Sequence, residues 1–129
     1  MRAGSVLFRV TSAVLVLQLL LGGLLTFGFI SVEAHEVAGF VLFILAIATM
    51  GVWLTTKPSL RSMRVLTVMI VVLILFQIIL GFATLDAGSQ AVAFIHFVNA
   101  LAIFGATISG TFLMLRWDQL AKVPEIHQK

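Results

Sequence analysis

Four long apolar stretches constrain this chain more than any other feature of its sequence. They run from about Ser5 to Ile30, Ala34 to Thr55, Val65 to Leu85 and Ala91 to Leu115. A helix needs roughly 20 residues to cross the hydrocarbon core of a bilayer, which is about 30 Å thick. Each stretch reaches that length, so the sequence predicts four transmembrane helices.

The composition leaves too little polar surface for a water-soluble globule. Of the 129 residues, 61% are hydrophobic and 10% are charged, and the mean hydropathy is +1.20. Only short connections remain between the spans, so we expect one domain over residues 1–129, an all-α integral membrane four-helix antiparallel bundle. The absence of cysteine excludes disulfides, thiolate metal sites and iron–sulfur clusters.

The charged residues follow membrane topology rather than a nucleic-acid-binding pattern. Lys and Arg occur before the first span, between the second and third, and after the fourth, and these three segments share one side of the membrane. The other two loops carry Glu33, Glu36 and Asp86 without Lys or Arg. The positive-inside rule therefore predicts a multi-pass plasma membrane protein with both termini in the cytoplasm, in contact with lipid and not with nucleic acid. The basic residues are Arg2, Arg9, Lys57, Arg61, Arg64, Arg116, Lys122 and Lys129.

The second half of the chain repeats the first. The stretch Gln18 to Gly22 (QLLLG) recurs as Gln77 to Gly81 (QIILG), and with two extra residues in the second loop His35 aligns with His96. Each half thus has a glutamine and a glycine within one helix, a short loop, and a histidine in the first turns of the next helix. These polar landmarks favour a duplicated helical hairpin over a chance likeness between leucine-rich helices.

The aligned histidines are the strongest candidates for a functional site. Their helices run in the same direction and are diagonal in an up-down-up-down bundle, so His35 and His96 are expected to face a common centre at similar depth. Ionisable side chains inside membrane spans are costly and usually functional. A histidine pair in an apolar bundle is typical of haem ligation, whereas zinc or copper needs three or four ligands. Alone, His35 is compatible with a structural role as a hydrated residue at a helix start, whereas His96 lies at least one turn inside its span. His127 lies in a polar tail.

Small residues follow each histidine by one turn, as a flat macrocycle would require. They are Ala38 and Gly39 after His35, and Asn99 with Ala100 after His96. Gln18 and Gln77 have two interpretations. In the first they form hydrogen bonds between helices, and in the second they line the cofactor pocket. The second interpretation adds Gln18, Gly22, Gln77 and Gly81 to the candidate cofactor-binding residues.

Two further patterns concern packing and the membrane interface. Rows of small residues on the last span predict close approach of another helix. Tryptophans near the basic ends of the second and fourth spans predict interfacial anchors. The rows are Ala102, Ala106 and Gly110, and Gly105 with Ser109, and the tryptophans are Trp53 and Trp117.

The whole pattern resembles the haem A synthase family, whose usual members have eight spans built as two four-helix halves with a histidine pair on the second and fourth helices of each. The chain corresponds to one half over essentially its whole length, through Gln18 to Gly22 with His35 and Gln77 to Gly81 with His96. The resemblance implies a bound haem b near the outer face and oxidation of the C8 methyl of haem O to the formyl group of haem A. One histidine pair gives one haem site, so it also implies a homo-oligomer or a partner.

Two positions depart from that family. Its members have a glutamate three residues before the first histidine and an arginine just after it. Here Glu33 stands two residues before His35, and Glu36 occupies the arginine position. The resemblance makes Glu33 the candidate catalytic residue for a synthase.

The alternative is a small cytochrome b-type electron-transfer subunit or partner of a respiratory complex, which needs no catalytic glutamate. A haem-free packing subunit or transporter is the third class, and the lack of paired charges and proline breaks disfavours transport.

Overall fold

The computed structural model describes residues 2–55 and 61–120. Within them lie four helices: α1 (Arg2–Thr26), α2 (Val32–Leu54), α3 (Arg61–Ala87) and α4 (Gln90–Leu120). Each is long and apolar enough to cross a membrane, so the predicted four-helix membrane bundle is confirmed. Lys57, Lys122, Lys129 and His127, which were considered in the sequence, lie outside the described residues.

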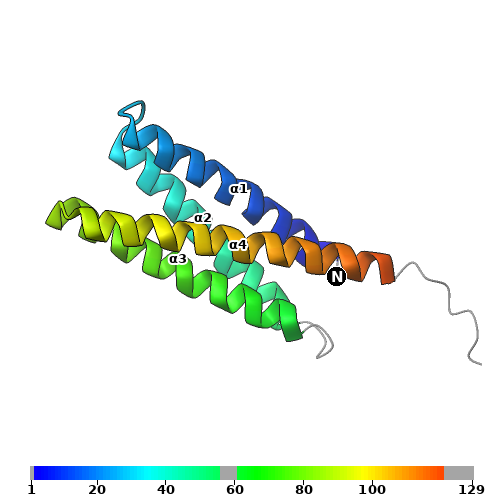
Figure 1. Cartoon of the computed structure of the whole chain (residues 1–129). Coiled ribbons are helices and arrows are strands. Elements are labelled where there is room, and N and C mark those ends of the chain that lie inside the picture. Colours follow the sequence, from blue (N-terminus) through cyan, green and yellow to red (C-terminus); the bar gives the residue numbers. More distant parts are fainter. Residues whose placement is uncertain (1, 56–60, 121–129) are drawn as a thin grey trace, which may run out of the picture.

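The four helices form two antiparallel hairpins. Helix α1 packs along α2 and α3 packs along α4, while α2 and α3 join the hairpins and α1 contacts α4 less extensively. Helices α2 and α4 are therefore diagonal, as the sequence predicted. Figure 1 shows that the hairpins lie close together at one end and diverge toward their α1–α2 and α3–α4 loops.

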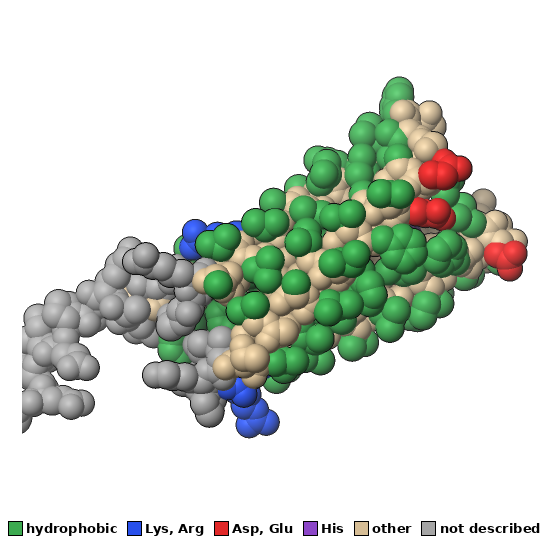
Figure 2. Space-filling model, turned by 180° about the vertical axis from the view of Figure 1, so that it is seen from behind, with side chains coloured by type: hydrophobic (Ala, Val, Ile, Leu, Met, Phe, Trp, Pro, Cys, Tyr) green, Lys and Arg blue, Asp and Glu red, His purple; other side chains and the backbone are tan. Residues whose placement is uncertain are grey.

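The charged side chains separate to opposite ends of the bundle. Figure 2 shows the Lys and Arg side chains near one end and the Asp and Glu side chains near the diverging loops. We call these the basic end and the acidic end. Between them the surface is apolar, with exposed side chains such as Leu20, Phe94 and Phe112. This surface suits contact with lipid tails, where apolar exposure carries no penalty.

Helix α1 ends four residues before the predicted limit of its span because of a glycine. Gly28 has a φ of +75°, a left-handed conformation that strains other residues. Its N–H donates to the carbonyl of Leu25 at 2.9 Å, and the N–H of Phe29 donates to that of Leu24 at 2.9 Å. This bonding is a Schellman motif, which terminates the helix at Thr26.

The second hairpin loop also starts at a glycine. Gly88 has a φ of +58°, and its N–H donates to the carbonyl of Thr84 at 3.1 Å. On the far side of the first loop, the hydroxyl of Ser31 accepts from the N–H of Ala34 and caps α2. Both loops therefore reverse the chain within a few residues, which keeps the two helices of each hairpin adjacent.

The buried core is concentrated toward the basic end. No residue of α1 after Leu15 is buried, nor any residue of α2 before Leu42 or of α4 before Asn99, within the described ranges. Helix α3 alone continues the core toward the acidic end, as far as Leu80. The core cluster comprises Phe8, Leu15, Leu42, Ala46, Trp53, Met63, Leu66, Ile70, Ile74, Ile103, Ala106 and Met114.

Two packing predictions need correction. Trp53 is 3% exposed and is not an interfacial anchor. It packs beside Gly4 of α1, where an added Cβ would lie 3.2 Å from the indole, so the missing side chain provides the space. On α4, Ala106 and Gly110 are buried as predicted, whereas Gly105 is exposed. Ala102 and Ser109 are exposed as well.

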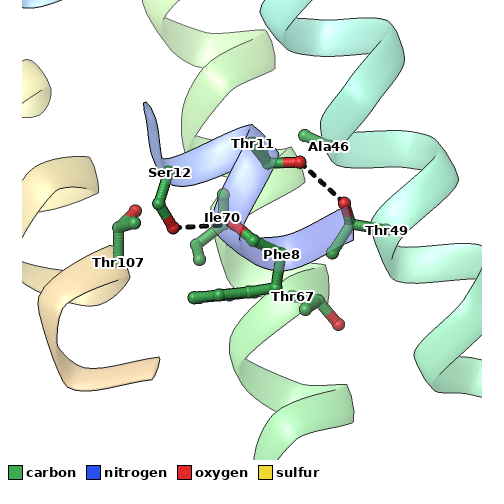
Figure 3. Close-up of a pocket in the computed structure, with 8 residues that line it drawn as sticks. All are labelled: Phe8, Thr11, Ser12, Ala46, Thr49, Thr67, Ile70 and Thr107. Carbon is green, nitrogen blue, oxygen red and sulfur yellow. Dashed lines mark hydrogen bonds between the residues drawn. The ribbon is translucent and has the colours of Figure 1, made fainter. Parts of the chain in front are cut away.

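Each helix contributes one buried threonine to a polar layer within the core (Figure 3). The hydroxyls of Thr11 and Thr49 lie 2.8 Å apart and join α1 to α2. Those of Thr67 and Thr107 donate to the carbonyls four residues earlier in their own helices. The layer borders a cavity of about 10 Å³, which has room for one water molecule at most.

Candidate functional site

In the first hairpin the structure brings Gln18 of α1 against His35 of α2. The Gln18 Nε2 donates to the backbone carbonyl of His35 at 3.0 Å. The same nitrogen lies 3.3 Å from both ring nitrogens of His35. The interpretation of this glutamine as an interhelical hydrogen-bonding residue is therefore confirmed, and its partner is the candidate ligand itself.

Two glycines make this approach possible. A Cβ added to Gly22 would lie 3.3 Å from Cε1 of His35, so the imidazole packs directly against the backbone of α1. A Cβ added to Gly39 would lie 3.1 Å from Nε2 of Gln18, so that amide packs against the backbone of α2. Both distances are tighter than ordinary van der Waals contact. Each glycine therefore makes room for a polar side chain of the neighbouring helix.

The second hairpin repeats the arrangement with its own residues. Gln77 Nε2 lies 3.0 Å from Nε2 of His96. A Cβ added to Gly81 would lie 3.4 Å from Cε1 of His96, so this ring also packs on a glycine of the preceding helix. The duplicated hairpin seen in the sequence is thus also a duplicated geometry. In each copy, one helix supplies a glutamine and a glycine and the next supplies the histidine.

Asn99 extends the second copy in a way that the first copy lacks. It is buried, and its Nδ2 donates to Oε1 of Gln77 at 2.6 Å and to the backbone carbonyl of Leu73 at 3.0 Å. Sequence reasoning placed Asn99 near a cofactor but missed its bond to Gln77. The signal in the sequence was an amide side chain one turn after His96 in an otherwise apolar helix, because a polar group in such a place requires a hydrogen-bond partner. Ala100 is half-buried beside it.

Two buried polar atoms of these clusters lack partners. Gln18 Oε1 and His96 Nδ1 have no hydrogen-bond partner among the residues that the structure describes. An unpaired buried polar group costs about 1–3 kcal/mol and requires an explanation. One explanation is a bound group or water that completes the site.

The two histidine clusters lie where the hairpins diverge. Both rings are half-buried, beyond the acidic limit of the core on α2 and α4. Figure 1 shows that the two hairpins diverge toward this end. The clusters therefore lie toward the end where the hairpins separate.

The acidic residues play a different part. Glu33 is exposed in the first turn of α2, two residues after the N-cap Ser31. Glu36 is half-buried and directly follows His35 in the chain. In the described ranges, no group of three or more His, Asp or Glu side chains could hold a metal ion. The site therefore offers two imidazoles, three primary amides and small residues.

No protein-family model, curated protein or solved structure matches the chain. The residues of the site therefore carry the functional argument.

Proposed function

We propose that the chain is a membrane haem-binding protein in which His35 and His96 are the two axial ligands. The observation that carries this proposal is the duplicated cluster, Gln18–Gly22–His35 in one hairpin and Gln77–Gly81–His96 in the other. Packing alone does not require the same costly polar residues at equivalent positions of both hairpins. A symmetric ligand that is held by one imidazole from each hairpin does require such residues in both hairpins.

The chemistry of the donor set supports a haem. Two imidazoles complete the coordination of an iron whose four other ligands come from a porphyrin, and no third protein ligand is needed. The glycines beside the rings and the unpaired atoms Gln18 Oε1 and His96 Nδ1 are consistent with a bound group in this region. We propose haem b as the resident cofactor, and such a haem supplies one-electron transfer.

Two activities follow from such a site. The resemblance to one half of a haem A synthase supports oxidation of the C8 methyl of haem O to a formyl group, with haem O as substrate and haem A as product. The second candidate is electron transfer as a cytochrome b-type subunit or partner of a respiratory complex. The exposure of Glu33 in the first turn of α2 favours the second, because it leaves the carboxylate in solvent rather than in an enclosed pocket. Either activity requires a homo-oligomer or a partner protein.

The proposed orientation follows the separation of charge. The basic end faces the cytoplasm and the acidic end faces outward, in the plasma membrane. Both termini then lie in the cytoplasm, and the histidine clusters lie near the outer face of the bilayer.

A reduced-minus-oxidised absorption spectrum of the detergent-purified protein, with extraction and identification of its haem, tests the proposal. We expect a sharp low-spin b-type spectrum. Haem O or haem A in the extract supports the synthase activity, and haem b alone supports electron transfer. A colourless protein that also fails to take up added haem contradicts the proposal.

A further inference from the structure

A groove runs along helix α3 at the basic end of the bundle, the opposite end from the histidine clusters. It has a volume of about 370 Å³ and is lined by five residues of α3 and one of α4. None of these residues belongs to the clusters around His35 and His96. The lining residues are Arg61, Ser62, Val65, Leu66, Met69 and Leu113.

The deeper part of the groove is apolar. Val65 and Met69 are four residues apart, so they follow one another along the same side of α3, and both are exposed. Leu66 beside them is buried and packs against Gly110 of α4, where an added Cβ would lie 2.7 Å from Cδ2 of Leu66. The half-buried Leu113 lines the groove from the side of α4. The groove is therefore an apolar channel between two membrane helices, with Leu66 as its floor.

The outer end of the groove is polar. Arg61 and Ser62 lie in the first turn of α3, and both are exposed. The first N–H groups of a helix have no partner within the helix and carry a partial positive charge. Arginines near the ends of membrane helices extend their guanidinium groups to the interface. Hydrogen-bond donors and positive charge thus lie together at the level of the lipid headgroups.

The two parts of the groove together specify an amphipathic ligand. From Arg61 to Met69 the groove follows α3 for about 12 Å into the bilayer, at about 1.5 Å per residue. Water is absent at that depth, so lipid tails fill such a channel. A soluble anion would occupy only the polar end, and an uncharged tail would occupy only the channel. The positive-inside rule accounts for Arg61 but not for the channel beside it.

We propose that this groove binds one anionic phospholipid. Its headgroup phosphate lies on Arg61 and Ser62, and one acyl chain lies in the apolar channel. A phosphate accepts hydrogen bonds from a hydroxyl and, in bidentate geometry, from a guanidinium. Basic pockets between membrane helices on the cytoplasmic side commonly bind anionic lipid headgroups, and the proposed orientation places the groove on that side. The inference depends neither on the haem nor on the activity proposed above.

Native mass spectrometry of the detergent-purified chain tests the proposal, with dioleoylphosphatidylglycerol and dioleoylphosphatidylcholine as probes. These two lipids have the same tails and differ in the net charge of the headgroup. We expect the first phosphatidylglycerol to bind saturably and more tightly than phosphatidylcholine. Inorganic phosphate at the same concentration is expected not to displace it, because phosphate has no tail. Equal binding of the two lipids, or displacement by phosphate, overturns the proposal.

The headgroup contact is tested with Arg61→Gln, which is expected to weaken phosphatidylglycerol binding about fivefold, the usual contribution of one arginine near an anionic membrane surface. Arg9→Gln is the matched control, because Arg9 is an exposed arginine of α1 that does not line the groove. We expect this control to keep wild-type lipid binding. Equal binding by the two variants would mean that the lipid responds to the net charge of the chain and not to this groove, and overturns the proposal.

The channel is tested with Val65→Phe, which fills it without changing the charge. Val65 and Val6 are both 60% exposed, and Val6 lies on α1 outside the groove, so Val6→Phe is the matched control. We expect Val65→Phe to weaken phosphatidylglycerol binding severalfold and Val6→Phe to leave it unchanged. Wild-type binding in Val65→Phe overturns the proposal. A colourless chain that binds phosphatidylglycerol with these preferences removes the proposed haem function and leaves the lipid site standing.

Discussion

The ring of Phe8 in α1 lies directly against the backbone of Gly110 in α4. A Cβ added to Gly110 would meet Cζ of Phe8 and would lie 2.7 Å from Cδ2 of Leu66. Phe8 is 2% exposed, so its ring is enclosed by the packed core. This contact joins the first helix to the last at the end where the hairpins converge.

Gly110→Ala is expected to destabilise the bundle by about 1–3 kcal/mol, the usual cost of overpacking a filled core. Unfolding in mixed detergent–SDS micelles, followed by circular dichroism, measures the change. Gly105→Ala is the matched control on the same helix, because an added Cβ there meets nothing within 4 Å. Equal stability of the two variants would contradict the packing role given to Gly110.

His96→Ala is expected to abolish the low-spin haem spectrum. His35→Ala is expected to do the same or to leave a five-coordinate high-spin haem, because one imidazole of the proposed pair remains. Absorption spectra of the purified variants, oxidised and reduced, measure both effects. Wild-type spectra in both variants would show that the ligands have been assigned wrongly.

Glu33→Gln is expected to leave the haem spectrum unchanged, because the carboxylate is exposed. If the chain oxidises haem O, the variant should form less haem A, since an amide cannot take up a proton. Chromatography of haems extracted from cells that supply haem O measures the conversion, with Glu36→Gln as the comparison. Unchanged conversion removes Glu33 from the mechanism.

The hydroxyl pair Thr11–Thr49 is expected to contribute a coupling energy of about 0.6 kcal/mol, the average for hydrogen bonds between membrane helices. A double-mutant cycle with Thr11→Val and Thr49→Val measures it from four unfolding curves. Ser109→Val is the control, because Ser109 is exposed and bonds to the carbonyl of Gly105 within its own helix. Additive effects of the two threonine replacements would mean that the 2.8 Å contact contributes nothing to stability.

Cysteine labelling tests the proposed orientation, because the chain has no cysteine of its own. Ala87→Cys at the acidic end and Ser62→Cys at the basic end both replace exposed residues. In intact cells, a membrane-impermeant maleimide is expected to label Ala87→Cys and to label Ser62→Cys only after lysis. The reverse pattern would place the basic end outside.

Helix number, helix order and the repeat follow from the sequence because they depend on local patterns. Apolar length defines the spans, and the repeat marks Gln18 and Gln77 as interhelical hydrogen-bonding residues, whereas their partners His35 and His96 were found only in the structure. Helix ends were less accurate. Hydropathy does not show that Gly28 ends α1 early, nor that α4 continues beyond the predicted end of its span at Leu115 to Leu120.

Lateral packing could not be read from the sequence. In a membrane helix both faces are apolar, so periodicity does not distinguish a buried position such as Trp53 from a lipid-facing one such as Phe112. The bond between Asn99 and Gln77 depends on the rotation of α4 against α3, which no single-helix pattern specifies. The layer of buried threonines could not be predicted from the sequence for the same reason.

The concentration of the core toward the basic end determines where substitutions are expected to affect folding most. In many proteins the residues that hold a ligand also hold the fold, so functional substitutions cost stability. Here most of the tight packing lies on one side of the bundle and the histidine clusters lie on the other. Replacements of exposed residues around the histidines are consequently expected to cost the bundle less stability than replacements in the core. What the acidic end binds is then expected to change by mutation more readily than the packing of the basic end.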